Sequence, residues 1–152
     1  MDAVFKKLNF KGESTVYAIN APDCLQESLD SIVNEANVKL NLKGAQEIAF
    51  ALVFVTQQKE IDLIIPTSGP LLKGDAVLWM CYPKGTSKKY KCDFNRDTGW
   101  SVLGNYSLEP VRMVAIDEDW SALRFRKVEY IKVLSRKLGI LSEAGKGKAK
   151  LQ

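Results

Sequence analysis

The sequence predicts a single α/β domain in which helices flank a mainly parallel central sheet and an antiparallel hairpin lies at the C-terminal end. The length of 152 residues, 46% of them hydrophobic, suits one domain with a substantial core. The segment from Ile48 to Val55 is apolar on both faces, which is typical of a central parallel strand covered on both sides. The other predicted strands are mostly separated by segments of helix length, as parallel connections require.

The first forty or so residues are predicted to hold a leader, a helix and two strands. Residues 1–13 are expected to form a loosely held leader. Residues 14–20 are rich in β-branched and aromatic side chains, which favours a strand. Asp23 is placed to cap a helix over residues 24–36, where apolar side chains recur at helical spacing. Residues 38–42 alternate apolar and polar side chains and indicate a short strand.

A helix, a turn and another strand are predicted to follow the central strand. Residues 58–65 suit the helix, and Pro66 and Pro70 are expected to interrupt it because proline lacks the backbone donor of a helix interior. Residues 71–75 are expected to turn, and residues 76–82 to form the next strand.

The next part of the chain is predicted to form a loop, a short helix and a hairpin. Residues 82–95 are mostly polar and indicate a loop. Asp97 is placed to cap a short helix that runs through Leu103. Residues 111–116 and 120–126 are then expected to pair as an antiparallel hairpin around a tight acidic turn.

The α/β domain is expected to span residues 14–138. Within it, residues 129–138 suit either a last helix or an extension of the hairpin strand. The Gly- and Lys-rich segment 139–152 is expected to be a flexible tail.

The composition narrows the possible chemistry. The chain has no histidine, which excludes Ser-His and Cys-His nucleophile pairs and removes the commonest general base. Cys24, Cys81 and Cys92 are an odd number without C-x-x-C spacing, so neither a disulfide framework nor a zinc site is expected. No metal or cofactor is predicted. The apolar runs are too short to span a membrane and the N-terminus lacks the core of a signal peptide, which favours a cytoplasmic protein.

The net charge of +4 is unevenly distributed. Residues 1–75 hold 7 basic and 10 acidic side chains, whereas residues 76–152 hold 15 basic and 8 acidic ones. This basic C-terminal half favours an anionic partner, such as phosphate, nucleotide, nucleic acid or an acidic protein. The plainer interpretation is a solvated basic face with a lysine-rich tail.

The best candidate site is the basic loop after the predicted strand 76–82. Lys84, Gly85, Thr86, Ser87 and Lys88 combine ammonium charge, a glycine and hydroxyl groups directly after a strand, where open α/β sheets place anion sites. The phosphate-loop pattern G-x-x-x-x-G-K-[ST] is absent. The alternative is therefore a mobile surface loop whose lysines keep it soluble.

Three arginines extend this candidate anion site. Arg96 follows the loop and is suited to clamp a carboxylate or phosphate, unless it pairs with a neighbouring carboxylate. Arg124 and Arg126 are expected on one strand face, with Leu123 and Phe125 on the opposite, core-facing side. Such a pair of arginines suits either a phosphate or cross-strand carboxylates.

Four segments together resemble an uncharacterised family of small bacterial proteins, a domain of unknown function. They are Tyr82-Pro83-Lys84-Gly85, Asn95-Arg96-Asp97-Thr98, Val114-Ala115-Ile116-Asp117 and Trp120-Ser121-Ala122-Leu123-Arg124-Phe125-Arg126. The last segment is the most specific. The resemblance implies a bacterial protein but supplies no activity.

The order of elements over residues 71–82 and 111–126 also resembles the later half of a Rossmann-like methyltransferase. That family has a glycine-rich cofactor loop after its first strand, whereas this chain has Asn20-Ala21-Pro22-Asp23 there. Without glycine the backbone cannot closely approach a nucleoside in the usual way. The resemblance therefore implies a related architecture that lost, or never had, its S-adenosylmethionine.

Three functions remain open from the sequence. The leading one is a non-enzymatic binding module for a small anionic ligand or a protein partner. One alternative is nucleic-acid binding through the basic C-terminal half, although no recognised nucleic-acid motif is present. The other is a degenerate Rossmann-like transferase.

The acidic turn at residues 117–119 offers oxygens for Mg²⁺ or a general base, but turn formation is the plainer interpretation. The pattern specifies no oligomeric state.

Overall fold

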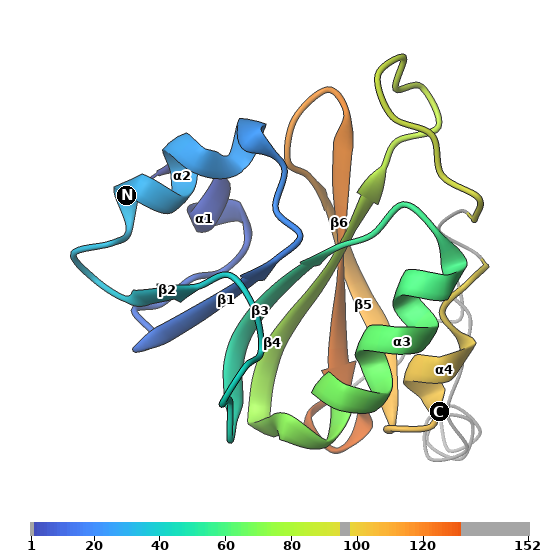
Figure 1. The fold of residues 1–152 in the computed structure, drawn as a ribbon. Helices are drawn as coiled ribbons and strands as arrows, with labels where there is room; N and C mark the ends of the chain where they lie inside the picture. Colours follow the sequence, from blue (N-terminus) through green and yellow to red (C-terminus); the bar gives the residue numbers. More distant parts are fainter. Residues whose placement is uncertain (1, 95–97, 132–152) are drawn as a thin grey trace.

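The computed structural model describes residues 2–94 and 98–131, which form one six-stranded mixed sheet flanked by helices (Figure 1). The predicted α/β class is confirmed, with a mostly parallel sheet and an antiparallel pair near the C-terminal end. Arg96, Asp97 and the predicted tail lie outside the described residues. The strands are β1 (Thr15–Ile19), β2 (Asn37–Lys39), β3 (Ile48–Phe54), β4 (Leu72–Pro83), β5 (Leu108–Ala115) and β6 (Trp120–Lys127).

The strand order across the sheet is β2-β1-β3-β4-β6-β5. The neighbours among β2, β1, β3 and β4 pair in parallel, and β6 pairs antiparallel with both β4 and β5. The chain moves outward from β1 to β2 and then returns to the other side of β1 to form β3. Open α/β sheets bind ligands at the carboxyl ends of the strands at such a reversal. We call the carboxyl ends of β1 and β3 the switch point.

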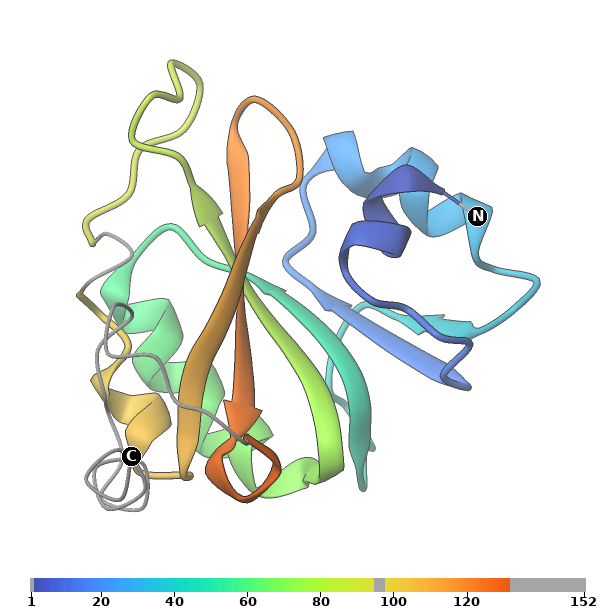
Figure 2. The ribbon, with the colours of Figure 1, turned by 180° about the vertical axis from the view of Figure 1, so that it is seen from behind.

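Helices cover both faces of the sheet (Figures 1 and 2). On one face lie α1 (Ala3–Lys7) and α2 (Gln26–Ser31), and on the other lie α3 (Gln58–Ser68) and α4 (Ser101–Gly104). Short 3₁₀ turns occupy Asp23–Leu25, Gly69–Leu71 and Val128–Tyr130. Strand β3 contributes buried side chains to both layers, as its apolar pattern predicts. Among the described helices, none is long and apolar enough to cross a membrane.

The expectation of a loosely held leader is wrong for residues 2–10. The Asp2 carboxylate accepts hydrogen bonds from two backbone N–H groups of α1, which caps the helix. Phe5, Leu8 and Phe10 are almost fully buried beneath it. The indole N–H of Trp79 in β4 donates to the Leu8 carbonyl oxygen at 2.8 Å. The leader therefore completes the core of one sheet face.

Two predicted breaks in the chain also differ from the structure. Helix α3 continues through Pro66 to Ser68. Pro66 lies on the exposed side of the helix, so solvent can satisfy the carbonyl that loses its donor. Strand β4 begins at Leu72, inside the expected turn. Gly74, with a φ of 58°, lies where the pairing of β4 with β3 is irregular.

The helix predicted over residues 24–36 is shorter than expected. A 3₁₀ turn leads into α2, which ends at Ser31. Val33 lies beyond that end and is 55% exposed, although its spacing suggested a core position. The predicted hairpin is confirmed, with both strands slightly longer than expected.

Candidate functional site

A hollow lined partly by aromatic residues lies where β4 ends. The basic loop, residues 84–92, leaves β4 here and borders a cavity of about 640 Å³. Its lining includes Tyr82, Lys84, Thr86, Tyr90, Lys91 and Phe94. We call this cavity the β4-end pocket.

The inner wall of the β4-end pocket is aromatic. The Tyr82 ring lies 6.0 Å from the Phe94 ring and 5.5 Å from the Trp100 ring, measured between centroids. The phenolic O–H of Tyr82 donates to the sulfur of Met113 at 3.3 Å. These contacts hold the Tyr82 ring in place. Tyr82 and Phe94 are only 6% and 9% exposed, so a flat ligand group would mainly contact more accessible lining residues such as Tyr90 and Met113.

The rim of the pocket is basic and rich in donors. The Lys84 side chain is half-buried and that of Lys91 is exposed. The backbone N–H groups of Gly85, Thr86 and Lys88 donate to no other residue in the described part of the chain. Unpaired amides beside ammonium groups are suited to hold an anion.

Hydrogen bonds tie the basic loop to the turn between β5 and β6. The Lys84 backbone N–H donates to the Asp119 carbonyl at 2.8 Å, and the Ser87 hydroxyl donates to the Asp119 carboxylate at 2.7 Å. The Ser87 oxygen also accepts from the backbone N–H groups of Lys89 and Tyr90. The Ser87 side chain therefore organises the loop, and the neighbouring residues remain available to a ligand.

The acidic turn has the structural role that its composition favours. The Asp117 carboxylate accepts from the backbone N–H groups of Asp119 and Trp120, each at 2.8 Å. Among residues 2–94 and 98–131, no group of three His, Cys, Asp or Glu side chains is arranged to hold a metal ion.

The predicted site residues do not all lie together. Lys84, Gly85, Thr86, Ser87 and Lys88 share the loop at the carboxyl end of β4. In the pairing of β4 with β6, Pro83 faces Trp120 while Trp79 faces Arg124 and Leu78 faces Phe125. Arg124 and Arg126 therefore lie toward the opposite, amino end of β4. As expected, Leu123 and Phe125 point into the core.

The switch point is filled by the protein itself. The Trp120 ring is 97% buried, with its centroid 5.2 Å from that of Phe54 at the end of β3 and 4.9 Å from that of Tyr90. Beyond β1, partial burial raises the pKa of the Cys24 thiol, and the nearby Asp117 carboxylate raises this pKa further. The hairpin turn thus reaches across to the segment that follows β1.

The residues at the switch point do not fit S-adenosylmethionine. The connection after β1 contains no glycine, and Asn20 takes the left-handed backbone conformation with a φ of 57°. Ala21 packs against the same core cluster as Tyr90 and Trp120. Side chains therefore occupy the place where a nucleoside would need close approach to the backbone.

Sequence reasoning placed the basic loop correctly at a strand end but missed the aromatic wall. The sequence predicts Tyr82 as a strand residue, and no predicted site includes Tyr90 or Phe94. The available signal was the run Lys89-Tyr90-Lys91, in which an aromatic side chain is flanked by basic ones. Phe94 carries no such local signal, because its position depends on how the loop returns to α3.

Comparisons with known proteins identify the fold. No protein-family model matches the chain, and no curated protein matches its sequence. The resemblance to a small bacterial family therefore stays a prediction. Among solved structures, the pyocyanin biosynthetic protein PhzM is similar at a TM-score of 0.55 and 9% identity, over 82% of this chain and 53% of PhzM. At this identity the likeness shows a shared fold alone, and this chain spans about half of PhzM.

Solved methyltransferases are also among the similar structures. A SAM-dependent methyltransferase from Aquifex aeolicus matches at a TM-score of 0.48 and 10% identity, over 81% of this chain and 87% of that protein. The N-methyltransferase NodS from Bradyrhizobium japonicum matches at 0.47 and 14%, over 75% of this chain and 85% of NodS.

Proposed function

We propose that this protein is a degenerate Rossmann-like transferase domain that no longer binds S-adenosylmethionine and that holds a small anionic ligand in the β4-end pocket. The observation that carries this proposal is the filled switch point within a sheet of order β2-β1-β3-β4-β6-β5. The transferase alternative accounts for this strand order, which a non-enzymatic binding module would leave unexplained.

The chemistry of the β4-end pocket favours a ligand with two parts. The accessible residues Tyr90 and Met113, which line the pocket together with the buried rings of Tyr82 and Phe94, suit a flat or apolar group. The rim at Lys84 and Lys91, with the free amides of the loop, suits a phosphate or carboxylate. A mononucleotide combines both parts, which makes adenosine monophosphate a suitable probe.

The proposal is tested by titrating the protein with adenosine monophosphate and, separately, with S-adenosylmethionine. Isothermal calorimetry measures affinity, and ¹H–¹⁵N NMR locates the perturbed amides. We expect saturable shifts in the basic loop with the mononucleotide and no saturable heat with S-adenosylmethionine. Binding of S-adenosylmethionine with shifts at residues 20–24 would show that the cofactor site is open and refute the degenerate assignment.

A matched pair of double variants distinguishes specific binding at the pocket rim from non-specific attraction to surface charge. Lys84→Ala/Lys91→Ala removes two charges from the pocket, and Lys39→Ala/Lys43→Ala removes two exposed charges near the β2 edge. We expect the pocket variant to weaken mononucleotide binding roughly tenfold or more, because charge-assisted hydrogen bonds are lost. Equal weakening in both variants would show that the attraction is non-specific.

A further inference from the structure

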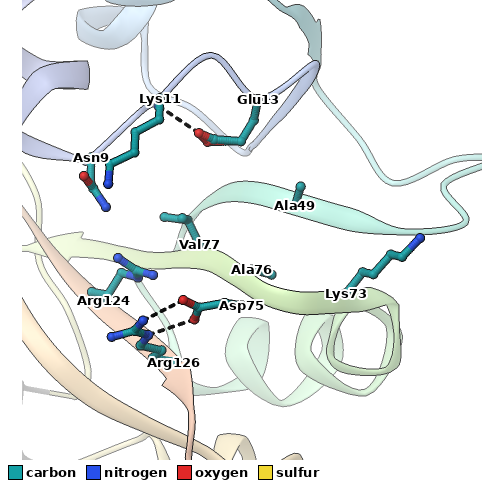
Figure 3. A pocket seen from close by; sticks show the side chains of 10 residues that line it. All are labelled: Asn9, Lys11, Glu13, Ala49, Lys73, Asp75, Ala76, Val77, Arg124 and Arg126. Atoms are coloured by element: carbon teal, nitrogen blue, oxygen red, sulfur yellow. Dashed lines mark hydrogen bonds and ion pairs between the residues drawn. The ribbon is translucent and has the colours of Figure 1, made fainter. Parts of the chain in front are cut away.

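A second hollow lies at the amino end of β4, on the face covered by the leader (Figure 3). Its volume is about 380 Å³. The leader segment 9–13 forms one side, and strands β3, β4 and β6 form the other. We call it the amino-end pocket, and define it by Lys11, Glu13, Asp75, Arg124 and Arg126.

One of its two arginines is already neutralised. The Arg126 guanidinium donates to both carboxylate oxygens of Asp75, from Nε to Oδ1 at 2.8 Å and from Nη2 to Oδ2 at 2.6 Å. This two-pronged pair lowers the pKa of Asp75. Within the described residues the Asp75 carboxylate accepts from Arg126, and no hydrogen bond joins it to Arg124.

The Arg124 side chain lies beside this pair and has no hydrogen-bond or ion-pair partner among the described residues. Its guanidinium is half-buried, and burial lowers its pKa. The Nε atom is shielded from solvent, yet it donates to no residue in the described ranges 2–94 and 98–131. In Figure 3 the Arg124 side chain lies between Asp75 on β4 and the leader residues Asn9 and Lys11. A shielded guanidinium donor without an acceptor is costly, and an oxyanion would satisfy it.

Glu13 on the other side supplies the complementary group. Its Oε1 accepts from the Lys11 backbone N–H at 2.8 Å, whereas its Oε2 is shielded and has no partner among the described residues. Among the described residues, the pocket thus presents one shielded donor and one shielded acceptor that lack partners. The Lys11 side chain, on the leader side of the pocket with Glu13, adds a positive charge to that of Arg124.

We propose that the amino-end pocket binds a small oxyanion that keeps a proton, namely hydrogen phosphate or a phosphate monoester. Arg124 donates to the unprotonated oxygens, and the Glu13 carboxylate accepts from the P–OH group. A fully deprotonated oxyanion of the same shape would place an oxygen lone pair against the Glu13 carboxylate and bind more weakly. This site is separate from the β4-end pocket, so neither assignment depends on the other.

The test compares inorganic phosphate with sulfate at about pH 7, where the hydrogen phosphate dianion carries one P–OH group and the sulfate dianion carries none. The readout is ¹H–¹⁵N NMR, including the side-chain Nε–H signal of Arg124. We expect phosphate to give saturable shifts at that signal and at the leader amides, with an affinity roughly tenfold above that of sulfate. Equal binding of the two anions, or shifts confined to the basic loop, would overturn the proposal.

Four variants locate the binding. Arg124→Gln is expected to weaken the phosphate binding seen at the amino-end pocket roughly tenfold or more, and Lys39→Ala/Lys43→Ala, which removes two exposed charges near the β2 edge, is expected to leave it unchanged. Glu13→Gln supplies an amide donor and should abolish the preference for phosphate over sulfate. Persistence of that preference in Glu13→Gln would refute the role of Glu13. If Arg124→Gln does not fold, Arg124→Lys provides a second test. Lysine keeps the positive charge but lacks the planar guanidinium that donates two parallel hydrogen bonds, so this variant is expected to bind phosphate more weakly than the wild type.

Discussion

Trp79 and Trp120 offer a matched test of how a buried indole N–H affects stability. Both side chains lie within the same sheet-face cluster, and they are 0% and 3% exposed. The Trp79 N–H donates to the Leu8 carbonyl at 2.8 Å. The Trp120 N–H has no partner within the described ranges. Replacing each by phenylalanine removes the same atoms from two equally shielded places, but with opposite consequences for hydrogen bonding.

The expected free energies of unfolding follow from this difference. The lost bulk destabilises both variants by a similar amount, about 1–2 kcal/mol. Trp79→Phe also leaves the Leu8 carbonyl unpaired, which costs about 1–3 kcal/mol more. Trp120→Phe removes an unpaired donor and recovers about 1 kcal/mol. We therefore expect Trp79→Phe to be the less stable variant by about 2–4 kcal/mol.

Urea unfolding measures this difference directly. With a slope of about 2 kcal/mol per molar urea, typical of small proteins, the two midpoints should lie roughly 1–2 M apart. Circular dichroism is the suitable probe, because each variant changes the tryptophan fluorescence. Coincident midpoints, or a lower midpoint for Trp120→Phe, would refute the reasoning from hydrogen-bond pairing.

Three further predictions concern other parts of the fold. Asp75→Asn should lower the free energy of unfolding by less than about 1 kcal/mol at neutral pH, since the pair is partly exposed. The pKa of Asp75 is lowered from 3.8, so this contribution is present above that value and disappears as pH falls through the lower folded-state pKa, which urea titrations at several pH values would show. Asp117→Asn keeps the acceptor oxygen of the turn but removes the charge that helps to raise the pKa of Cys24. The Cys24 thiol should then react faster with a disulfide reagent, and an unchanged rate would contradict the contact. Gly69→Ala should destabilise the protein by about 1–3 kcal/mol because its Cβ would lie 2.7 Å from an aromatic ring, whereas Gly85→Ala meets nothing within 4 Å and should leave thermal unfolding unchanged.

Local patterns were sufficient to predict most of the strands. The run from Ile48 to Val55 is apolar on both faces because β3 is covered on both faces. Leu123 and Phe125 alternate with arginines because one face of β6 packs on the core. The leader could not be predicted in this way, because a five-residue helix is too short to show a period. Its position depends on Trp79, which is 71 residues away in the sequence.

The candidate sites show the same limit of local information. The basic loop could be placed because it follows a strand directly, and the end of a strand defines an end of the sheet. The position of Arg124 and Arg126 relative to that loop depends on the pairing of β6 with β4. Antiparallel pairing places the start of β6 beside the loop and its arginines toward the far end. The sequence predicts which face of β6 these arginines share. The distance between the arginines and the basic loop, measured along the strands, depends on the register of the pairing between β6 and β4.

The contact between the leader and β4 has a consequence for the order of folding during synthesis. The hairpin of β5 and β6 pairs residues close in sequence and can form quickly, whereas the docking of Leu8 on Trp79 closes a loop of 71 residues. At synthesis rates of about 5–20 residues per second, the leader waits roughly 4–14 seconds for its partner to be made. During that interval Phe5, Leu8 and Phe10 have no core to enter. The leader, which is translated before β4, is thus a segment to which a chaperone could bind during synthesis.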